Sequence, residues 1–354
     1  MVFSPVVPLI LNISRPFSYG SASSTSKNTF PYVEKTDDLS RSMFTYLIDE
    51  SAEATAENSV ESLISKIAHS GASCIKLYFE DGYGNANQWA TLSTNTLKRI
   101  KLAAEKSNLL IVAHANALDM QQLALAAGVD VIAHGMWNWG QYNREQNIPK
   151  EIAKTLDKMI NDEVGYMPTQ RVIAGLGEVM LPTIVNSPEF SSITPKSLID
   201  WYKTTEAQWF KEELRIGFDG MPDQSISDTF LYGRIGKGNK VIQYLRSSNH
   251  PILLASDFPG SPSFANQPGL TTYQEMKAMV TAELSLEEVL AAATINNAKQ
   301  FGMDNDYGTV EVGKIANLLL LKSNPLESIE SWDSIETIIL HGEPIARESL
   351  VVNK

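Results

Sequence analysis

Short apolar runs alternate with amphipathic segments along most of the chain. The apolar runs are rich in Val, Ile, Leu and Ala, which is typical of buried strands in a parallel sheet. They predict strands at residues 73–79, 109–114, 129–133, 164–168 and 251–256. The segments between them predict helices at residues 57–70, 94–107, 118–127, 149–162, 195–214 and 238–248. This alternation favours an α/β fold with a parallel sheet, and strand spacings of roughly 20–35 residues suit a (β/α) barrel.

The pattern changes after residue 257. Residues 271–282 and 285–301 predict two more helices, and the second is rich in Ala. Three short strands follow, and they have the character of β-hairpins with Gly342 at a turn; they are predicted at residues 315–322, 334–342 and 344–347. Antiparallel hairpins cannot extend a parallel barrel, so these strands predict a small appended sheet.

Composition narrows the classes of partner. The chain has 354 residues, a net charge of -12 and no cluster of Lys and Arg, which argues against nucleic acid as a partner. No apolar run is long enough to predict a transmembrane segment. Residues 2–12 are apolar but lack the basic start of a signal peptide. The single Cys74 excludes an internal disulfide, so the compartment stays open: the cytoplasm is favoured for the chain as given, and a longer N-terminus could carry a signal for secretion or the periplasm.

Four polar residues each follow a short apolar run: Lys76 in CIKLY, His114 in IVAHAN, His134 in VIAHG and Asp257 in LLASD. The carboxyl ends of strands in a parallel barrel meet on one face, where active sites lie. A lysine, two histidines and a carboxylate meeting there indicate a metal site. The alternatives are ordinary: a solvated lysine, two core histidines, and an aspartate that caps a turn.

Other residues are candidates for contact with a substrate. Tyr78 shares a strand face with Lys76, because side chains alternate with period two, and Trp137 follows His134 closely. Gln170 and Arg171 come just after the predicted strand at 164–168 and could hold a substrate carboxylate. Core packing for the aromatic residues, and a surface position for Arg171, are the competing interpretations.

Six segments from about residue 55 to the end resemble the amidohydrolase superfamily, particularly its imidazolonepropionase-like and prolidase-like members. They are GASCIKLY, LLIVAHAN, AGVDVIAHG, ILLASDFPG, LEEVLAAATINNAKQFGM and YGTVEVGKIANLLLLKSNPL, the last with Asn317 where Asp is usual. The resemblance implies a (β/α)8 TIM-barrel hydrolase domain at residues 1–303. It also implies that residues 304–354 form the C-terminal part of a composite β-sandwich domain.

The resemblance also implies a chemistry. It makes the chain a metal-dependent hydrolase that uses a divalent metal such as zinc to activate water against a carbon–nitrogen bond. The substrate is then a small molecule or peptide with an amide, a cyclic amide or a dipeptide bond. By motif, Lys76 is a carbamylated bridging ligand, His114 and His134 bind the second metal, and Asp257 binds the first metal and takes the proton of the attacking water.

One family feature is missing. The first strand of the family carries His-x-His, but no two of the five histidines here are separated by one residue; they are His69, His114, His134, His250 and His341. Residues 6–20 look like the third barrel strand, so we expect the front of the barrel to be shortened. A fragment, a wrong start and real degeneration to a non-catalytic protein remain alternatives, as does a substrate-binding protein without turnover. Unpaired strand edges would favour a homo-oligomer.

Overall fold

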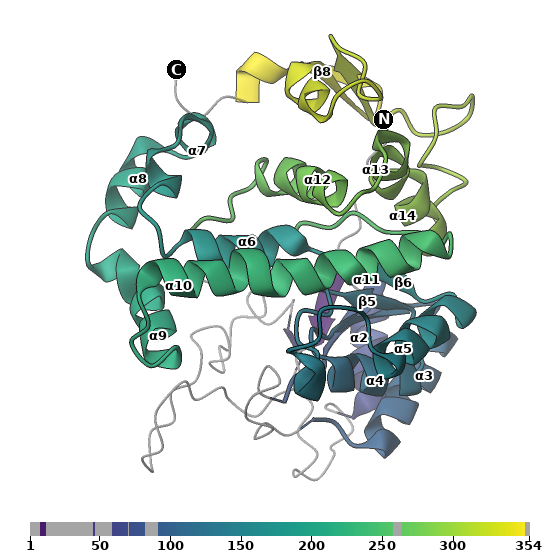
Figure 1. The fold of residues 1–354 in the computed structure, drawn as a ribbon. Helices are drawn as coiled ribbons and strands as arrows, with labels where there is room; N and C mark the ends of the chain where they lie inside the picture. The colour runs from purple at the N-terminus through teal and green to yellow at the C-terminus, as the bar shows by residue number, and fades with distance from the viewer. Residues whose placement is uncertain are drawn as a thin grey trace. The chain divides into compact units, whose positions relative to one another are not determined.

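The computed structural model describes residues 59–69, 71–81, 91–257 and 264–350, together with the backbone of the strands at 8–11 and 45–46 (Figure 1). The chain divides into two compact units. The N-terminal unit is Pro5–Gly165, and the C-terminal unit is Tyr166–Lys354 with Met1–Ser4. The predicted loop at 18–39, and most of the one at 80–90, lie outside the described residues.

The N-terminal unit contains a parallel sheet in the order β2-β1-β3-β4-β5. Its strands are β1 (Pro8–Leu11), β2 (Thr45–Tyr46), β3 (Cys74–Tyr78), β4 (Leu110–His114) and β5 (Val131–Ala133). The last three confirm the predicted strands to within two residues at either end. Their apolar side chains, such as Ile75, Ile111 and Ile132, are almost fully buried. Helices cover both faces of a parallel sheet, so its strands carry apolar side chains on both faces.

Helices connect these strands, as the periodicity predicts. They are α2 (Val60–His69), α3 (Thr94–Lys106), α4 (Leu118–Ala126) and α5 (Lys150–Asn161), with a 3₁₀ turn at Gly140–Tyr142. Helix α2 packs against α3, and α4 packs against α5. Ser93 caps α3 by accepting a hydrogen bond from the Thr96 amide at 3.2 Å, and Gly128 follows α4 with a φ of 74°. Capping and left-handed glycine are the ordinary signals of helix ends.

The C-terminal unit is mainly helical. After β6 (Gly165–Met167), which spans the boundary between the units, its helices run in the following order: α6 (Gln170–Glu178), α7 (Pro188–Ile193), α8 (Lys196–Tyr202), α9 (Trp209–Gly217), α10 (Asp223–Asp228), α11 (Ile235–Ser247), α12 (Thr271–Thr281), α13 (Leu286–Ala292) and α14 (Ile295–Gln300). A π-helical segment, Thr229–Arg234, joins α10 to α11, and Figure 1 shows the three as one long helix. Helix α6 packs against α12 and against this π-helical segment. None of the helices in the described residues is long and apolar enough to cross a membrane.

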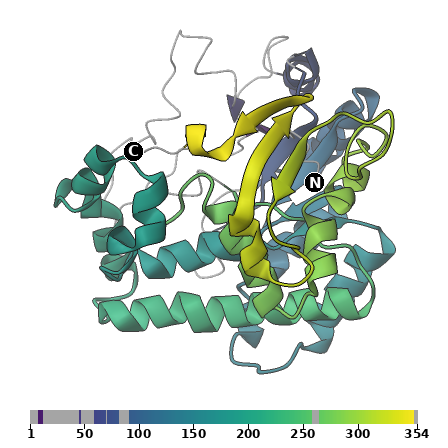
Figure 2. The same cartoon turned by 90° about the horizontal axis from the view of Figure 1, so that it is seen from above.

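A three-stranded antiparallel sheet follows the helices, as the sequence predicts (Figure 2, yellow). Its strands are β7 (Leu318–Leu321), β8 (Ile335–Leu340) and β9 (Glu343–Ala346); 3₁₀ turns at Ile329–Ser334 and Arg347–Leu350 flank the β8–β9 pair. His341 and Gly342 both have positive φ, 51° and 87°, which is the backbone of a two-residue hairpin turn. Asn317 supports this turn, because its Oδ1 accepts the His341 amide at 2.7 Å.

Three predicted elements differ from the structure. The helix at 195–214 is broken between α8 and α9, where the Gln208 side chain donates to the Tyr202 carbonyl at 2.6 Å and ends the first helix. The helix at 285–301 is broken at Thr294, whose φ and ψ of −136° and −93° are not helical. The strand at 251–256 forms only an isolated bridge between Ile252 and Tyr166.

In the segment at 251–256, side chains take the place of a neighbouring strand as hydrogen-bond donors to the backbone carbonyls. The Asn296 and Asn297 side chains donate to the carbonyls of Ile252 and Leu254 at 3.0 and 2.9 Å. Two helix-borne amides therefore take the place of a neighbouring strand. An apolar run predicts burial here correctly, but it cannot distinguish these two sources of hydrogen bonds.

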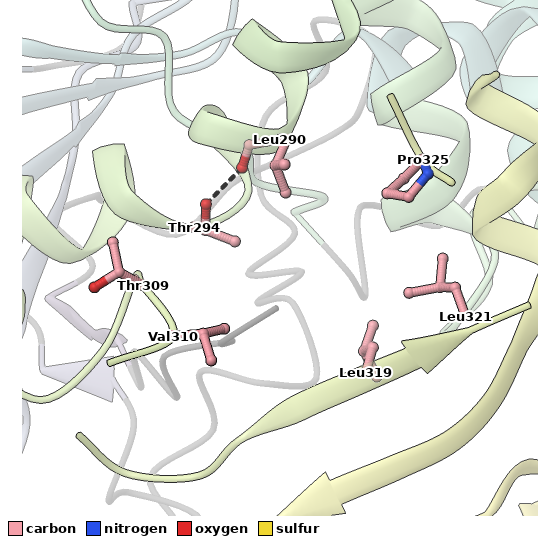
Figure 3. Close-up of a pocket in the computed structure, with 8 residues that line it drawn as sticks. Leu290, Thr294, Thr309, Val310, Leu319, Leu321 and Pro325 are labelled. Atoms are coloured by element: carbon pink, nitrogen blue, oxygen red, sulfur yellow. Dashed lines mark hydrogen bonds between the residues drawn. The ribbon is translucent and has the colours of Figure 1, made fainter. Parts of the chain in front are cut away.

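An apolar pocket of about 370 Å³ lies between α13 and β7 in the C-terminal unit. Figure 3 shows Leu290 on one side and Leu319 and Leu321 on the other. The Thr294 hydroxyl donates to the Leu290 carbonyl at 2.6 Å, so this polar group is already used within the wall. The pocket therefore offers mainly van der Waals contact.

Candidate functional site

Three of the predicted ligands lie in the N-terminal unit, on or directly after the strands β3, β4 and β5. Tyr78 and His114 are the last residues of β3 and β4 and are direct partners in the strand register, and His134 directly follows β5. Lys76 lies two residues before Tyr78 on β3. Because the strands are parallel and adjacent, their carboxyl ends lie at the same edge of the sheet.

Aromatic rings form a continuous cluster at this edge. The Tyr78 and His114 rings are stacked, with centroids 3.9 Å apart and planes 18° apart. The His134 ring meets His114 edge to face at 4.5 Å, and the Trp137 indole lies 5.7 Å from His134. Edge-to-face and offset contacts of this kind fix ring orientation. The two imidazoles are therefore held beside each other by neighbours on both sides.

The backbone after β5 has an unusual conformation. His134 has a φ of 83°, in the region that residues with a Cβ adopt only when their surroundings impose it. The next residue must be glycine, because a Cβ on Gly135 would lie 2.3 Å from Nε1 of Trp137. The Trp137 and Asn138 amides then donate to the Asn116 carbonyl at 3.0 and 3.2 Å. The loops that follow the two histidines are thus bonded to each other.

Electrostatics favour a neutral His134. The side chain is buried, and its burial lowers the pKa of His134 well below the ordinary 6.5; the neighbouring His114 and Lys76 act in the same direction. A neutral imidazole keeps a lone pair on one ring nitrogen, which is the form that binds metal ions.

His114 has two polar neighbours at Nε2. The Asn116 side-chain amide nitrogen is 3.4 Å from it, and the Glu80 Oε2 is 3.6 Å from it. The amide can donate to this nitrogen when the ring is neutral, and the carboxylate pairs with it when the ring is protonated. The Glu80 side chain is completely buried, so its charge is poorly screened by water.

Sequence reasoning missed Glu80 and Asn116, although two signals could have found them. The period-two alternation that places Lys76 and Tyr78 on one face extends to Glu80. Asn116 follows His114 at the same interval of two residues. The buried Gln121 of α4 was also missed, and its position gave no signal, because it lies in a helix that looks like ordinary packing.

The donors at this edge fit a metal ion through their chemistry. Among the residues that the structure describes, no group of three or more His, Cys, Asp and Glu side chains is placed to hold an ion. Two adjacent imidazoles, one of them neutral, supply nitrogen ligands. Lys76 could supply an oxygen ligand only as a carbamate, because its ammonium form is a cation.

Asp257 belongs to the C-terminal unit. It ends the segment that begins at Pro251, it is half-buried, and it has a φ of 50°. The residues after it, 258–263, are not among those described. The four predicted ligands therefore fall into two groups: Lys76, His114 and His134 in one unit, and Asp257 in the other.

Gln170 and Arg171 form the first turn of α6, inside the C-terminal unit. The Gln170 side chain donates to Asn239 Oδ1 at 2.7 Å and to the Ile235 carbonyl at 3.2 Å. The Arg171 guanidinium forms a two-point pair with Glu178, at 2.6 and 2.5 Å. Both side chains thus have internal partners, and contact with a substrate carboxylate stays a prediction.

Comparison with known proteins finds a family match in the C-terminal part of the chain. The model of the amidohydrolase family matches residues 239–345. An imidazolonepropionase from Pseudomonas savastanoi pv. phaseolicola is 25% identical over 191 residues, which is 51% of this chain and 46% of that protein. The chain therefore spans about half the length of this curated relative.

Solved structures agree in fold. A Xaa-Pro dipeptidase with bound methionine has a TM-score of 0.55 at 19% identity, covering 81% of this chain and 58% of that one. An amidohydrolase has a TM-score of 0.57 at 16% identity, covering 95% and 67%. The α/β fold with its parallel sheet therefore matches TIM-barrel proteins of this kind. Residues 239–345 thus match the amidohydrolase family, and the chain is a distant homologue of imidazolonepropionases with a fold similar to those of prolidases.

Proposed function

We propose that the chain is a metal-dependent hydrolase that uses water to cleave a carbon–nitrogen bond in an amide, a cyclic amide or a dipeptide. The observation that carries the proposal is the pair of imidazoles at the ends of β4 and β5, with ring centroids 4.5 Å apart. The match to the amidohydrolase family supports a hydrolase, and the donor types support a metal. The substrate is a small molecule or peptide.

The proposal includes a fold that is finer than the parallel sheet. It is a (β/α)8 barrel over residues 1–303 that is incomplete at its front. Residues 304–354 are the C-terminal part of a composite β-sandwich. The parallel order of β1 to β5 and the antiparallel sheet of β7 to β9 support these two parts.

Three side chains of the N-terminal unit would hold the ion. His114 and His134 would supply nitrogen ligands, and Lys76 would supply oxygen as a carbamate. Zinc suits such a mixture of nitrogen and oxygen donors. When bound, the ion would supply Lewis acidity and lower the pKa of a water molecule toward neutrality.

The protein's own residues would perform the remaining tasks. Tyr78 holds the plane of the His114 ring by stacking on it. Burial keeps His134 neutral and therefore able to donate its lone pair. The Asp257 carboxylate would accept a proton from the attacking water and return it to the leaving amine nitrogen. This last role rests on the sequence motif of Asp257.

Hydrolysis of a panel of substrates tests the proposal. The full chain is loaded with Zn²⁺ and given N-acyl amino acids, Xaa-Pro dipeptides and cyclic amides, and release of the amine is measured with and without a chelator. We expect chelator-sensitive turnover of at least one class. His134→Gln and Asp257→Asn should abolish it. His69→Gln is the matched control, because His69 is an exposed histidine on α2 whose bonds among the described residues are to Ser65 of its own helix.

Two outcomes would contradict the proposal. Turnover that survives His134→Gln would remove the imidazole pair from the mechanism. Absence of turnover on every substrate class, in a chain that folds cooperatively and takes up no zinc, would favour the alternative of a degenerate, non-catalytic family member.

A further inference from the structure

A buried glutamine bridges the two strands that carry the histidines. Gln121 lies on α4 and is completely buried. Its side-chain amide nitrogen donates to the Ala115 carbonyl at 2.9 Å and is 3.4 Å from the His134 carbonyl. Ala115 directly follows His114, so both acceptors lie at the strand ends that form the site.

This bridge begins where the sheet ends. The last backbone bond of the sheet between the two chain segments runs from the Ala115 amide to the Ala133 carbonyl, at 3.2 Å, and the next ones join the Asn116 carbonyl to the loop after His134. One residue further on, the carbonyls of Ala115 and His134 are both hydrogen-bond acceptors, so they cannot bond to each other. The two hydrogens of one NH₂ group can satisfy both. Gln121 therefore bridges the gap between the last bond of the sheet and the bonds between the two loops.

The bond from Gln121 to the His134 carbonyl matters because His134 has a positive φ. A non-glycine residue keeps such a conformation only when its neighbours over-determine it. Trp137 packs over Gly135 on the C-terminal side of His134, and Gln121 holds the His134 carbonyl. Relaxation of φ to a negative value would rotate the Cα–Cβ bond and move the imidazole away from His114.

The oxygen of the Gln121 side-chain amide shows that packing alone does not account for a glutamine at this position. Its Oε1 is buried and accepts no hydrogen bond from any residue that the structure describes. A buried acceptor without a donor is unfavourable, and an apolar side chain of the same length would avoid it. The two donated bonds are then the reason for an amide at this position.

We propose that Gln121 is a positioning residue that holds the backbone of His134 in its left-handed conformation and thereby keeps the two imidazoles side by side. The inference about backbone and rings stands on the contacts of Gln121. Its consequence for metal binding rests on the proposed function.

The chain contains a matched control at the next position. Gln122 is on the same helix, and its amide nitrogen donates to Thr155 Oγ1 at 3.0 Å and to Glu151 Oε1 at 3.3 Å. It joins α4 to α5 instead of joining the strands. Gln122→Met and Gln121→Met thus remove the same amide from neighbouring positions, with different consequences for the site.

The test uses ¹H–¹³C spectra of the five histidine rings in the full chain, assigned with single His→Gln variants, together with titration by Zn²⁺. In Gln121→Met, the His114 and His134 signals should shift while those of His69, His250 and His341 stay in place. Zn²⁺ affinity should fall about 10–100-fold, as is usual when the support of a ligand is removed. Gln122→Met should change neither.

The outcomes separate the two proposals. If Gln121→Met leaves the His114 and His134 signals unchanged, or if Gln122→Met shifts them equally, Gln121 does not position the site. Gln121→Leu is the second variant; if both replacements fail to fold, Gln121 is a structural residue and the inference is overturned. Shifted signals in a chain whose wild type takes up no Zn²⁺ would uphold the positioning role and refute the proposed metal function.

Discussion

Glu275 offers the most specific test of how the C-terminal unit is held together. It lies on α12, is completely buried, and accepts the Gln170 and Arg171 amides at 3.0 and 2.6 Å. These are the first two amides of α6, and the side chain of its N-cap residue, Thr169, does not cap them. A carboxylate from another helix therefore caps α6, where the positive end of the helix dipole favours an anion.

Burial works against that anion. It raises the pKa of Glu275 from 4.5 to about 7, although the two amides and the Arg171 charge stabilise the carboxylate. Between these pH values the folded chain holds a proton that the unfolded chain has released. Stability therefore falls as pH rises, by ~1.4 kcal/mol per pH unit. Over this interval the loss amounts to about 3 kcal/mol.

Glu275→Gln removes this titration and leaves the shape unchanged. Urea unfolding of the wild type and the variant is measured from pH 4.5 to 8, and the free energies of unfolding are subtracted at each pH. At pH 4.5 the folded wild type carries a protonated Glu275, whose hydroxyl oxygen can still accept an amide, whereas the NH₂ group of glutamine cannot; the variant should therefore be less stable there, by about 1–3 kcal/mol. We expect the advantage of the wild type to shrink by about 3 kcal/mol by pH 8.

Glu288→Gln is the control. Burial raises the pKa of Glu288, but bonds from Arg246 and Ser285 outweigh it and the net change is downward. A lowered carboxyl pKa costs stability only when pH falls through it, below 4.5, so this difference curve should be flat above pH 4.5. A flat curve for Glu275→Gln, or one in which the wild-type advantage grows with pH, would refute the reasoning about burial.

Two further substitutions test single contacts. Gly135→Ala should destabilise the chain by about 1–3 kcal/mol in urea unfolding, because its Cβ would overlap the Trp137 indole. Gly217→Ala meets no atom within 4 Å and should change stability by less than about 1 kcal/mol; equal effects would contradict the close contact. Arg171→Lys should cost about 1–3 kcal/mol, because an ammonium cannot form the two-point pair with Glu178, and a cycle with Glu178→Gln that shows no coupling would contradict that pair.

The regular part of the fold was predictable because it depends on local pattern. The apolar runs ending at Tyr78, His114 and Ala133 predict their strands because both faces of a parallel sheet are buried. The turn at His341 and Gly342 was predictable from its glycine. The breaks in two predicted helices were not, because they depend on the hydrogen bonds of single side chains such as Gln208. Periodicity does not register such bonds.

The sequence supplies the candidate ligands of the site, whose metal role stays a prediction, but it does not supply the residues that support them. Histidines at the ends of apolar runs can be recognised in a sequence. The contact of Gln121 with two carbonyls and the cap that Glu275 places on α6 depend on residues brought together by the tertiary fold. The conformation of His134 also could not be predicted, because positive φ is uncommon for every residue other than glycine, and nothing in the local sequence requires it here.

The central claim is that His114, His134 and Lys76 bind one metal ion, and metal content tests it most directly. The wild-type chain is incubated with Zn²⁺, desalted, and analysed for zinc per chain beside His134→Gln and the control His69→Gln. With two imidazoles and one modified lysine as donors, the account predicts about one zinc in the wild type and in His69→Gln, and almost none in His134→Gln. A wild type without zinc, or equal zinc in all three proteins, would contradict it.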